Sequence, residues 1–371
     1  MNIVLSCAGT GGHIYPAIAI ADKIRAEEPD AKILFIGTKT GMENRLVPAA
    51  GYEIRGIDAS GLNRRNLLKN FQTAANLVRG SREVGTILGE FKPDAVLGTG
   101  GYVTGTVIRK ASRMGIPCFI HEANVVPGLA NKLLERYVRK VFISFEDSRE
   151  HFAEKDKLVY TGNPIRSEFR QPDRAKARQH LGAMEGERMI LITGGSLGAD
   201  VPNHAALDLI RALAGKKGGI RVFFVTGKRY FNEISAELSE IDGSSDFVTL
   251  IDYADNMPEL MAASDLVVSR SGAIAMTEIL ASGKPSILIP SPNVTNNHQY
   301  FNAKSAADAG AALLIEEKDL QDGYAVFTQA VLQLIADGPA LARMGENAAK
   351  TARTDAVDII YSKMKRAISA R

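Results

Sequence analysis

The same local pattern occurs twice in this chain: an apolar run ends in a glycine-rich turn, and the turn leads into a helix-like segment. The first copy is Asn2–Ala8 followed by Gly9–His13, and the second is Met189–Thr193 followed by Gly194–Gly198. Glycines let the backbone turn tightly, and the unpaired N–H groups at the start of a helix favour an anion. The pattern predicts two similar α/β domains whose anion-binding turns face each other across a cleft.

Strand-like runs alternate with helix-like stretches along the whole chain, as in βαβ units that form a parallel sheet. The turn-prone segment Thr161–Pro164 separates two sets of runs, which predicts domains at 1–163 and 164–345. Beyond these, a helical tail at 346–371 could pack back on the first domain. The predicted strands are 2–8, 32–37, 94–98, 117–120, 140–144 and 158–160, then 188–193, 220–225, 247–251, 266–268 and 285–289.

Composition excludes several classes of protein. Hydrophobic residues make up 45% of the chain, yet no apolar run is long enough to span a bilayer, and no basic segment precedes the first apolar run, so we expect no secretory signal and a cytoplasmic protein. A net charge of +3 is too small to indicate a nucleic-acid partner. Cys7 and Cys118 lie in apolar runs without other ligands at metal-binding spacing, which predicts buried thiols.

A further glycine cluster, Gly98–Gly105, follows the apolar run Ala95–Leu97. Turns after strands of one parallel sheet share an edge, so this cluster and Gly9–His13 together predict a diphosphate site that includes Gly100, Gly101 and Tyr102. His13 distinguishes the first turn from a simple nucleotide-binding turn, because a histidine titrates near neutral pH and can act as a base. The alternative is a structural turn with a solvated histidine.

In the second half, Ser269–Glu278 follows a short apolar run and exposes the start of a helix to an anion. The carboxylate of Glu278 could accept hydrogen bonds from both ribose hydroxyls of a nucleotide, whereas the alternative is a solvated surface glutamate. The polar loop Pro290–Gln299 suits sugar hydroxyls, although a capped loop that opens a helix at Tyr300 explains it equally well.

Several catalytic signatures are missing from the sequence. No Asp-x-Asp pair occurs that would hold a divalent metal on a nucleotide diphosphate. We therefore expect helix N-termini and backbone amides to stabilise the negative charge on the leaving group. A Gly-Lys-Ser/Thr phosphate loop is also absent, which argues against P-loop ATPase chemistry.

The segment 64–82 combines basic residues with apolar residues at helical spacing. Plain core packing is one interpretation of this pattern. The other is contact with an anionic membrane surface, where basic side chains meet lipid headgroups beside inserted apolar ones. The basic residues are Arg64, Arg65, Lys69, Arg79 and Arg82.

Together the motifs resemble the MurG family of bacterial peptidoglycan glycosyltransferases (glycosyltransferase family 28), which transfer N-acetylglucosamine (GlcNAc) from UDP-GlcNAc to lipid I. The resemblance covers nearly the whole chain and implies a GT-B architecture of two Rossmann-like domains, without a cofactor or metal. The matching segments are Gly9 to Pro16, Gly98 to Gly105, His121 to Asn124, Gly162 to Arg166, Gly194 to Ala199, Ser269 to Glu278 and Asn297 to Gln299.

The resemblance also implies partners and site residues. The partners are UDP-GlcNAc, lipid I (undecaprenyl-pyrophosphoryl-MurNAc-pentapeptide) and the anionic cytoplasmic face of the cell membrane, to which the protein binds peripherally. Glu278 would contact the ribose, and the backbone of Ile251 would contact uracil. The donor-site residues carried over are Thr10, Gly11, Gly12, Asn124, Arg166, Ser196, Ile251, Ala273, Ile274, Ala275, Met276, Thr277, Glu278 and Gln299.

The reaction of this family inverts the anomeric centre, which requires one displacement by the 4-hydroxyl of MurNAc and one base. His13 is the candidate base, and Glu122 is the alternative or orients the imidazole. Competing functions that share the donor are a diacylglycerol glycosyltransferase, a UDP-GlcNAc 2-epimerase and a non-enzymatic nucleotide-sugar sensor. A neutral diacylglycerol has no group for the paired glycine turns to bind, which favours a diphosphate lipid.

Overall fold

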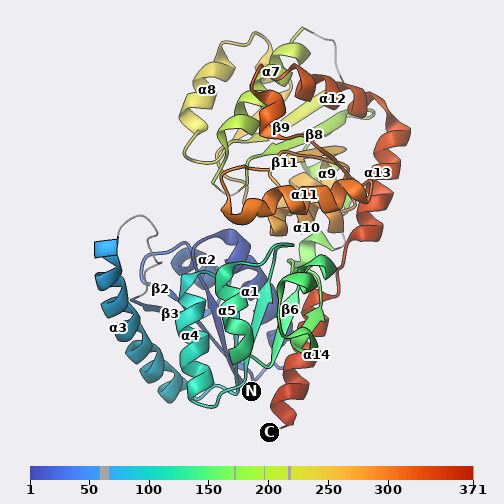
Figure 1. Cartoon of the computed structure of the whole chain (residues 1–371). Coiled ribbons are helices and arrows are strands. Elements are labelled where there is room, and N and C mark those ends of the chain that lie inside the picture. Colours follow the sequence, from blue (N-terminus) through green and yellow to red (C-terminus); the bar gives the residue numbers. More distant parts are fainter. Residues whose placement is uncertain (59–66, 171–172, 196, 216–218, 371) are drawn as a thin grey trace. The chain divides into compact units, whose positions relative to one another are not determined.

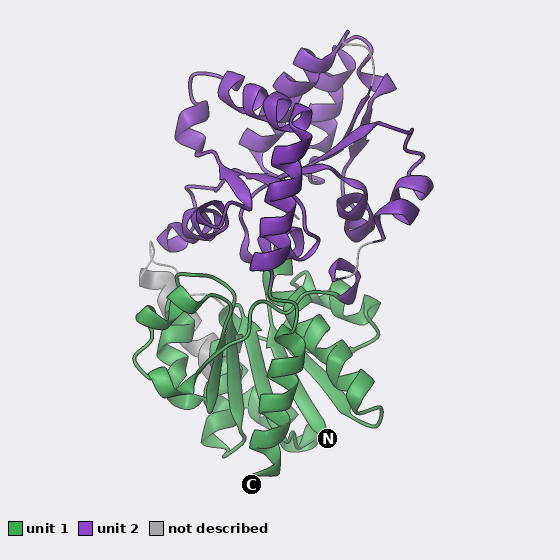
Figure 2. Ribbon diagram, turned by 90° about the vertical axis from the view of Figure 1, so that its right-hand side faces the viewer, with its two compact units in different colours: residues 1–166, 353–371 green, residues 167–352 purple. Residues whose placement is uncertain are grey.

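A computed structural model describes residues 1–58, 67–170, 173–195, 197–215 and 219–370, and within the helix segment 67–78 it describes the backbone alone. The chain divides into two compact units. The first unit comprises residues 1–166 and 353–371, and the second comprises residues 167–352 (Figure 2). The predicted boundary at 163/164 lies close to the first crossing, while the predicted start of the tail at 346 falls inside a helix of the second unit.

The first unit is built on a parallel sheet of seven strands in the order β3-β2-β1-β4-β5-β6-β7. Most residues of its central strands are apolar and buried, as are Ile3, Val4 and Leu5 of β1. In the described part of this unit, helices pack on the sheet together with the returning C-terminal helix (Figure 1). The strands are β1 (Asn2–Cys7), β2 (Lys32–Thr38), β3 (Glu53–Ile57), β4 (Ala95–Gly100), β5 (Cys118–Glu122), β6 (Lys140–Ile143) and β7 (Leu158–Tyr160).

Two apolar clusters cover the two faces of this sheet. One contains α1 and α14 side chains packed on alternate strand residues such as Ile3 and Leu5, and the other contains α3 and α4 side chains packed on Val4. Period-two alternation along β1 explains why its neighbouring residues enter different clusters. The helices are α1 (Gly11–Glu27), α2 (Glu43–Ala49), α3 (Leu67–Phe91), α4 (Tyr102–Arg113), α5 (Leu129–Leu134) and α14 (Ala356–Ser369).

Helix α14 returns from the second unit and packs on α1. Its residues Val357, Ile360 and Met364 are buried in the same cluster as the α1 side chains. At the surface, the Tyr361 hydroxyl and Lys365 both donate hydrogen bonds to Glu28 Oε1, at 2.8 and 2.6 Å. The C-terminal helix is therefore part of the core of the first unit.

The second unit is built on a parallel sheet of six strands in the order β10-β9-β8-β11-β12-β13. Its core joins strand residues such as Ile190 and Phe224 to helix residues such as Leu209 and Phe327. The strands are β8 (Arg188–Thr193), β9 (Ile220–Val225), β10 (Val248–Ile251), β11 (Leu266–Ser269), β12 (Ser286–Leu288) and β13 (Ala312–Leu314). The helices are α6 (Arg174–His180), α7 (Asp200–Leu213), α8 (Phe231–Ser239), α9 (Met257–Ala263), α10 (Ala273–Ala281), α11 (His298–Asp308), α12 (Ala325–Ala336) and α13 (Gly338–Thr351).

The structure confirms the predicted α/β class with parallel sheets, and each predicted strand has a counterpart. Two strands were not predicted: β3 carries charged residues at Glu53 and Arg55, and β13 has only three residues. Both lie at an edge of their sheet. The two cysteines are free and buried, as predicted.

Within the part of the chain that the structure describes, no single helix is long and apolar enough to cross a membrane. One helix pair, Ala325–Ala336 with Gly338–Ser369, is long and apolar enough only when its parts are taken together, and it is bent by 94°.

Candidate active site

The first glycine turn joins β1 to α1 at the carboxyl edge of the first sheet. Gly9 has a φ of +96°, a conformation that glycine adopts without steric cost. Thr10 precedes α1, and its carbonyl accepts hydrogen bonds from the backbone N–H groups of His13 and Ile14, at 3.0 and 3.2 Å. The turn therefore places the start of α1, with its N–H groups, at the edge of the sheet where ligands bind.

His13 is half-buried in the first turn of α1. Its Nδ1 atom lies 2.9 Å from the carbonyl oxygen of Ala8. Because a carbonyl only accepts, Nδ1 carries the proton in the neutral imidazole and Nε2 keeps a lone pair. Thr99 fixes the backbone of the same residue by donating a hydrogen bond to the His13 carbonyl, at 2.7 Å. The histidine is thus held in the tautomer that a base acting through Nε2 requires.

The second glycine cluster of this unit lies directly against the first. β4 pairs with β1, and the pairing ends with Gly100 opposite Cys7. Gly100 and Gly101 have φ values of +128° and +86°. A Cβ atom on Gly100 would lie 2.7 Å from His13 Nε2, and one on Gly101 would lie 2.5 Å from the Ala8 carbonyl oxygen. Tyr102 then begins α4 with a half-exposed side chain. These turns were predicted to share an edge of the sheet, and the structure places them in contact.

Glu43, the first residue of α2, supports the first glycine turn and was not predicted. Its buried carboxylate accepts hydrogen bonds from the Thr38 N–H at 2.9 Å, the Thr38 hydroxyl at 2.5 Å and the Gly9 N–H at 3.2 Å. Burial alone would raise the pKa of Glu43, but the hydrogen bonds from Thr38 and Gly9 outweigh it and hold the pKa below its usual range. A Cβ atom at Gly37 or Gly41 would collide with the Glu43 side chain. These two glycines are the only feature of the nearby sequence that relates to the buried position of Glu43 in the described structure.

Glu122, at the end of β5, organises the loop that follows it. Its Oε1 accepts hydrogen bonds from the Asn124 N–H at 3.0 Å and the Asn124 Nδ2 at 3.2 Å. Its Oε2 accepts from the Gly128 N–H at 3.0 Å and from Asn131 Nδ2 at 2.8 Å. The hydrogen bond on His13 Nδ1 goes to Ala8, so Ala8 rather than Glu122 orients the imidazole. Four hydrogen bonds on one buried carboxylate indicate that Glu122 shapes the loop around Asn124.

The neighbouring His121 is buried in a polar network. Its Nε2 atom lies 2.9 Å from the Ser144 hydroxyl, which also lies 2.8 Å from Asn163 Oδ1. Asn163 Nδ2 in turn donates to the Ala123 carbonyl at 3.1 Å. Burial lowers the pKa of His121 to about 4, with a further lowering by His13, so the ring is neutral. The network ties β5 and β6 to the segment after β7.

Arg166 belongs to the first unit, whereas the predicted boundary assigned it to the second. Its guanidinium carbon lies 4.7 Å from the centre of the Tyr15 ring, two residues after His13 on α1. The structure thus brings Arg166 to α1, the helix that begins with Gly11 and Gly12 of the predicted donor site and that Thr10 precedes.

In the second unit, the glycine turn after β8 packs backbone to backbone against the turn after β9. Gly198 and Gly227 have φ values of +73° and +85°, and a Cβ atom on Gly227 would lie 2.5 Å from the Gly198 Cα. Ser196 lies outside the described residues. Ile251 ends the adjacent strand β10, and its carbonyl accepts a hydrogen bond from the Thr226 N–H at 3.0 Å. These turns share the carboxyl edge of the second sheet.

Helix α10 begins after Gly272 at the same edge and carries the residues predicted for the nucleotide. Glu278 is 8% exposed, so the solvated surface glutamate considered as an alternative is wrong. Thr277 donates a hydrogen bond from its hydroxyl to the Ala273 carbonyl at 2.8 Å. Ile274 and Met276 are buried, and Ala275 is half-buried. The backbone N–H groups at the start of α10 remain the groups best suited to an anion.

The polar loop 290–299 is tied to the turn that precedes α10. The Ser271 hydroxyl donates to the Gln299 carbonyl at 2.8 Å, and Gln299 Oε1 accepts a hydrogen bond from the Ser291 N–H at 2.9 Å. Asn296 and Asn297 have φ values of +56° and +50°, in the left-handed region. Helix α11 starts at His298, close to the predicted start at Tyr300.

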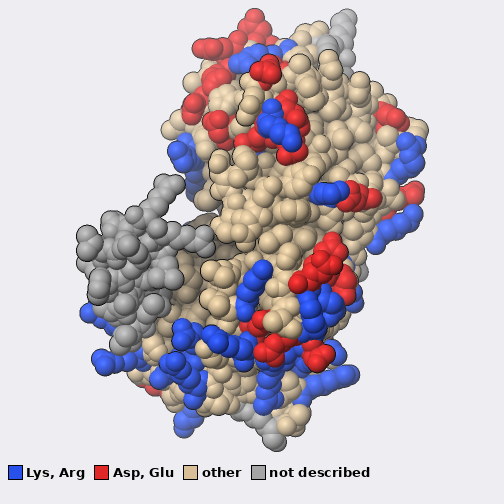
Figure 3. All heavy atoms as spheres, in the orientation of Figure 1, with Lys and Arg blue, Asp and Glu red and all other residues tan. Residues whose placement is uncertain are grey.

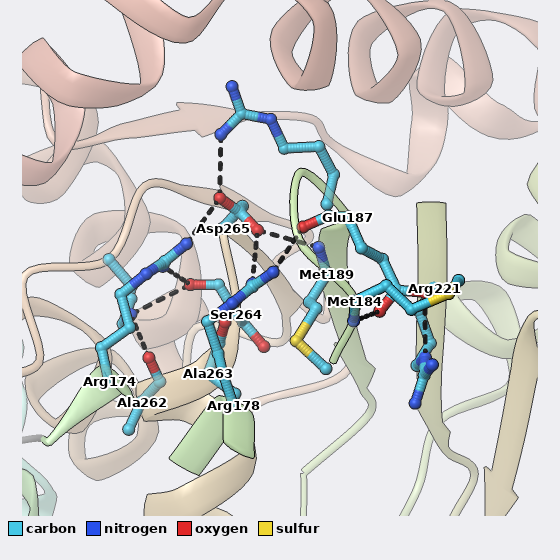
Figure 4. Close-up of polar contacts among 12 residues, drawn as sticks. Arg174, Arg178, Met184, Glu187, Met189, Arg221, Ala262, Ala263, Ser264 and Asp265 are labelled. Atoms are coloured by element: carbon cyan, nitrogen blue, oxygen red, sulfur yellow. Dashed lines mark hydrogen bonds and ion pairs between the residues drawn. The ribbon is translucent and has the colours of Figure 1, made fainter. Parts of the chain in front are cut away.

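A buried ionic cluster lies at the opposite edge of the second sheet, where β8 and β11 begin (Figure 4). Asp265 accepts hydrogen bonds from Arg174 at 2.9 Å and from the Met189 N–H at 2.8 Å, and Arg178 and Arg188 pair with it as well. Burial lowers the pKa of Lys284, which donates to the Ala262 and Ser264 carbonyls, to about 7. This cluster holds α6 and α9 to the sheet and contains no predicted site residue.

Comparison with known proteins gives the same assignment for both units. Residues 3–143 match the glycosyltransferase family 28 N-terminal domain, and residues 189–360 match the C-terminal domain of that family. The UDP-N-acetylglucosamine–N-acetylmuramyl-(pentapeptide) pyrophosphoryl-undecaprenol N-acetylglucosamine transferase of Thermoanaerobacter sp. (strain X514) is 41% identical over 98% of this chain and 99% of its own length.

Solved structures agree on the fold. The crystal structure of MurG from Acinetobacter baumannii has a TM-score of 0.76 and 25% identity over 98% of this chain and 99% of its own. The UDP-GlcNAc 2-epimerase of Neisseria meningitidis has a TM-score of 0.71 at 18% identity, covering 99% of this chain and 100% of its own, and this likeness concerns the fold alone. With both domains of the family matched and a full-length relative at 41% identity, the chain belongs to glycosyltransferase family 28, among its MurG-type N-acetylglucosaminyltransferases of the GT-B fold.

Proposed function

We propose that this chain transfers GlcNAc from UDP-GlcNAc to the 4-hydroxyl of MurNAc in lipid I, with inversion at the anomeric carbon, and so forms lipid II for peptidoglycan. The observation that carries the proposal is the full-length similarity to a transferase with this name, joined to the tautomer of His13. A Nε2 lone pair beside two glycine turns suits a base that accepts a proton from a hydroxyl near a diphosphate.

The first unit would bind the acceptor. Helices α1 and α4 both begin at the same sheet edge, after Thr10 and Gly101, and their free N–H groups can bind the lipid diphosphate. The glycines at 100 and 101 leave the space into which a side chain would otherwise project. The contact between the turn after β1 and the turn after β4 supports this proposal, because it places the starts of α1 and α4 close together.

The second unit would bind the donor. The start of α10 offers N–H groups to the UDP diphosphate, and the largely buried Glu278 would accept hydrogen bonds from the ribose hydroxyls. Ile251 would contact uracil through its backbone, and Gln299 keeps the 290–299 loop against the Ser271 turn. Ser196 and the glycines of the first loop in this unit would complete the diphosphate contacts.

The reaction would proceed as one displacement. His13 Nε2 takes the proton of the MurNAc 4-hydroxyl while the hydroxyl oxygen attacks C1 of GlcNAc. UDP departs from the opposite face of that carbon. Negative charge that develops on the UDP diphosphate is stabilised by helix N-termini and backbone N–H groups. A protonated His13 is stabilised by the Ala8 carbonyl, which accepts from Nδ1.

Membrane attachment would occur through the face of the first unit that carries α4 and α5. On α5, Leu129 and Leu133 are exposed at 57% and 55%, and Lys132 lies between them. Arg109 and Arg113 are exposed on α4, which contacts α5, and Arg136 is exposed shortly after α5. Figure 3 shows Lys and Arg side chains gathered on this side of the unit. Apolar residues within a basic surround suit peripheral binding to anionic lipid on the cytoplasmic face.

The residues predicted for this contact are only partly described. Arg64 and Arg65 lie outside the described residues, as does the side chain of Lys69, while Arg79 and Arg82 are exposed on α3. Helix α3 packs beside α4, so these two arginines belong to the same side of the sheet as Arg109. The membrane contact of segment 64–82 therefore remains a proposal, and we add the exposed α5 residues Leu129 and Leu133 to the proposed membrane-binding surface.

A product assay tests the function. Radiolabelled UDP-GlcNAc is offered with lipid I, with diacylglycerol, or with no acceptor, and label in the lipid extract and in free sugar is measured. We expect label to enter lipid only with lipid I. Label in a glycosyldiacylglycerol, or conversion of UDP-GlcNAc without an acceptor, would instead support the diacylglycerol transferase or the 2-epimerase.

A further inference from the structure

Three side chains on the outer helices of the second unit are arranged as ligands of a metal ion. His204 lies on α7, and Glu233 and Glu237 lie one turn apart on α8. One ligand atom from each lies within 4.8 Å of the other two. The two glutamates are like charges at i and i+4, an arrangement that disfavours a helix unless a cation lies nearby.

The hydrogen bond on the other ring nitrogen prepares His204 for this role. Its Nδ1 atom lies 3.1 Å from the Asp200 carbonyl, so Nδ1 carries the proton of the neutral ring and Nε2 keeps its lone pair. The Asp200 carboxylate lies 3.5 Å from the same Nδ1. A backbone carbonyl or carboxylate on the far nitrogen is the arrangement that orients histidine ligands in metal sites.

The distance between the ligand atoms favours an ion between them. His204 Nε2 and Glu237 Oε1 are 3.7 Å apart, which is too long for a hydrogen bond. Two ligands bound tetrahedrally to Zn²⁺ at about 2.1 Å each lie about 3.4 Å apart. Either a second proton on His204, which would then form an ion pair with Glu237, or a metal ion between the two atoms supplies positive charge at this separation, and zinc titration distinguishes the two. Arg211 lies 3.7 Å from the other carboxylate oxygen of Glu237, Oε2.

We propose that His204, Glu233 and Glu237 bind a zinc ion that joins α7 to α8. One imidazole and two carboxylates are a zinc ligand set that leaves a fourth position for water, and Mg²⁺ prefers six oxygen ligands. The site contains none of the residues proposed for glycosyl transfer. Its role is to brace the two helices, and α7 follows directly on the glycine turn that packs against Gly227.

Calorimetric titration of the full-length protein with ZnCl₂ tests the site. We expect one equivalent of Zn²⁺ to bind, with affinity reduced at least tenfold in both His204→Ala and Glu237→Gln, and no comparable binding of MgCl₂. His180→Ala is the matched control, because His180 also pairs with a glutamate, Glu259, in the same unit. The control should bind zinc like the wild type. Equal binding by wild type, His204→Ala and Glu237→Gln would overturn the proposal, as would no binding by wild type.

Thermal unfolding provides a second readout that also checks the variants. Zinc should raise the unfolding midpoint of the wild type and of His180→Ala, and leave those of His204→Ala and Glu237→Gln unchanged. Midpoints measured without metal show whether the variants fold. If His204→Ala is unfolded, Glu233→Gln replaces it, because Glu233 is exposed and its amide keeps the size of the side chain. A midpoint that zinc shifts equally in wild type and in these variants would contradict the site.

Discussion

The imidazole of His13 lies directly against the backbone of Gly100, where a Cβ atom would come within 2.7 Å of Nε2. This contact joins the turn after β1 to the turn after β4. It explains why residue 100 is a glycine, since both the φ of +128° and the neighbouring ring exclude a side chain. Any change at position 100 therefore acts on the atom proposed to take the proton.

Gly100→Ala should slow transfer on the order of 10²-fold, because the new methyl group displaces His13 Nε2 from the acceptor hydroxyl. The rate of UDP release at saturating substrates measures the effect. Gly105→Ala is the matched control, since a Cβ atom there meets nothing within 4 Å and φ is not positive. A Gly100→Ala enzyme as fast as the Gly105→Ala enzyme would contradict the proposed contact.

His13→Ala should lower kcat by about 10² to 10⁴-fold, the range that a general base contributes. It should also remove the acidic limb of the pH–rate profile, because no group then needs to lose a proton before reaction. Binding of UDP to the second unit should be unchanged. A loss smaller than about tenfold, or a retained acidic limb, would exclude His13 as the base.

Glu122→Gln should destabilise the protein by about 1–3 kcal/mol, since an amide nitrogen would face the donors at Asn124, Gly128 and Asn131. Activity should fall through the displaced loop, yet the acidic limb of the pH–rate profile should remain. Chemical denaturation and the pH–rate profile measure the two effects. In Glu146→Gln, which breaks only an exposed pair with Arg149, stability should change by less than about 0.5 kcal/mol. An unchanged stability of Glu122→Gln with loss of the acidic limb would make Glu122 the base.

Stability should decrease as the pH falls from about 6.5 to 4, because of His121. Its pKa is about 4 in the folded protein and 6.5 in the unfolded chain, so only the unfolded chain binds a proton in this window. Above pH 6.5 neither state is protonated, and the total loss across the window is about 3 kcal/mol. The free energy of unfolding measured at pH 7 and pH 5 tests this.

His121→Gln should flatten that pH dependence, and His151→Gln, at an exposed position, should leave it intact. The comparison isolates the buried ring from the other titrating groups. An equal slope in the wild type and in His121→Gln would show that His121 does not titrate as its burial requires.

The sequence predicted the sheets well and the supporting residues poorly, for physical reasons. Strands such as β1 and β8 are buried on both faces and therefore consist of continuous apolar runs. β3 and β13 lie at sheet edges. β3 contains charged residues and β13 has only three residues, so neither forms a clear apolar run in the sequence. His13 and Gly100 were predicted because each follows a strand, and the carboxyl ends of parallel strands meet.

Glu43 and the Ala8 carbonyl were not predicted, because their roles depend on contacts between segments distant in the sequence. Glu43 contacts Gly9 across 34 positions, and no local spacing indicates that pairing. The four hydrogen bonds on Glu122 come from the loop after β5 and from Asn131 of α5, and packing rather than a motif sets the path of that loop. A catalytic or an orienting role for Glu122 was therefore equally compatible with the sequence.

The most direct test of the proposed function is the release of UDP from UDP-GlcNAc, measured with and without lipid I. Acceptor-dependent transfer predicts UDP release only when lipid I is present, in equal amount to the lipid II formed, and strongly reduced in His13→Ala. UDP release or UDP-GlcNAc conversion at the same rate without lipid I would contradict the account.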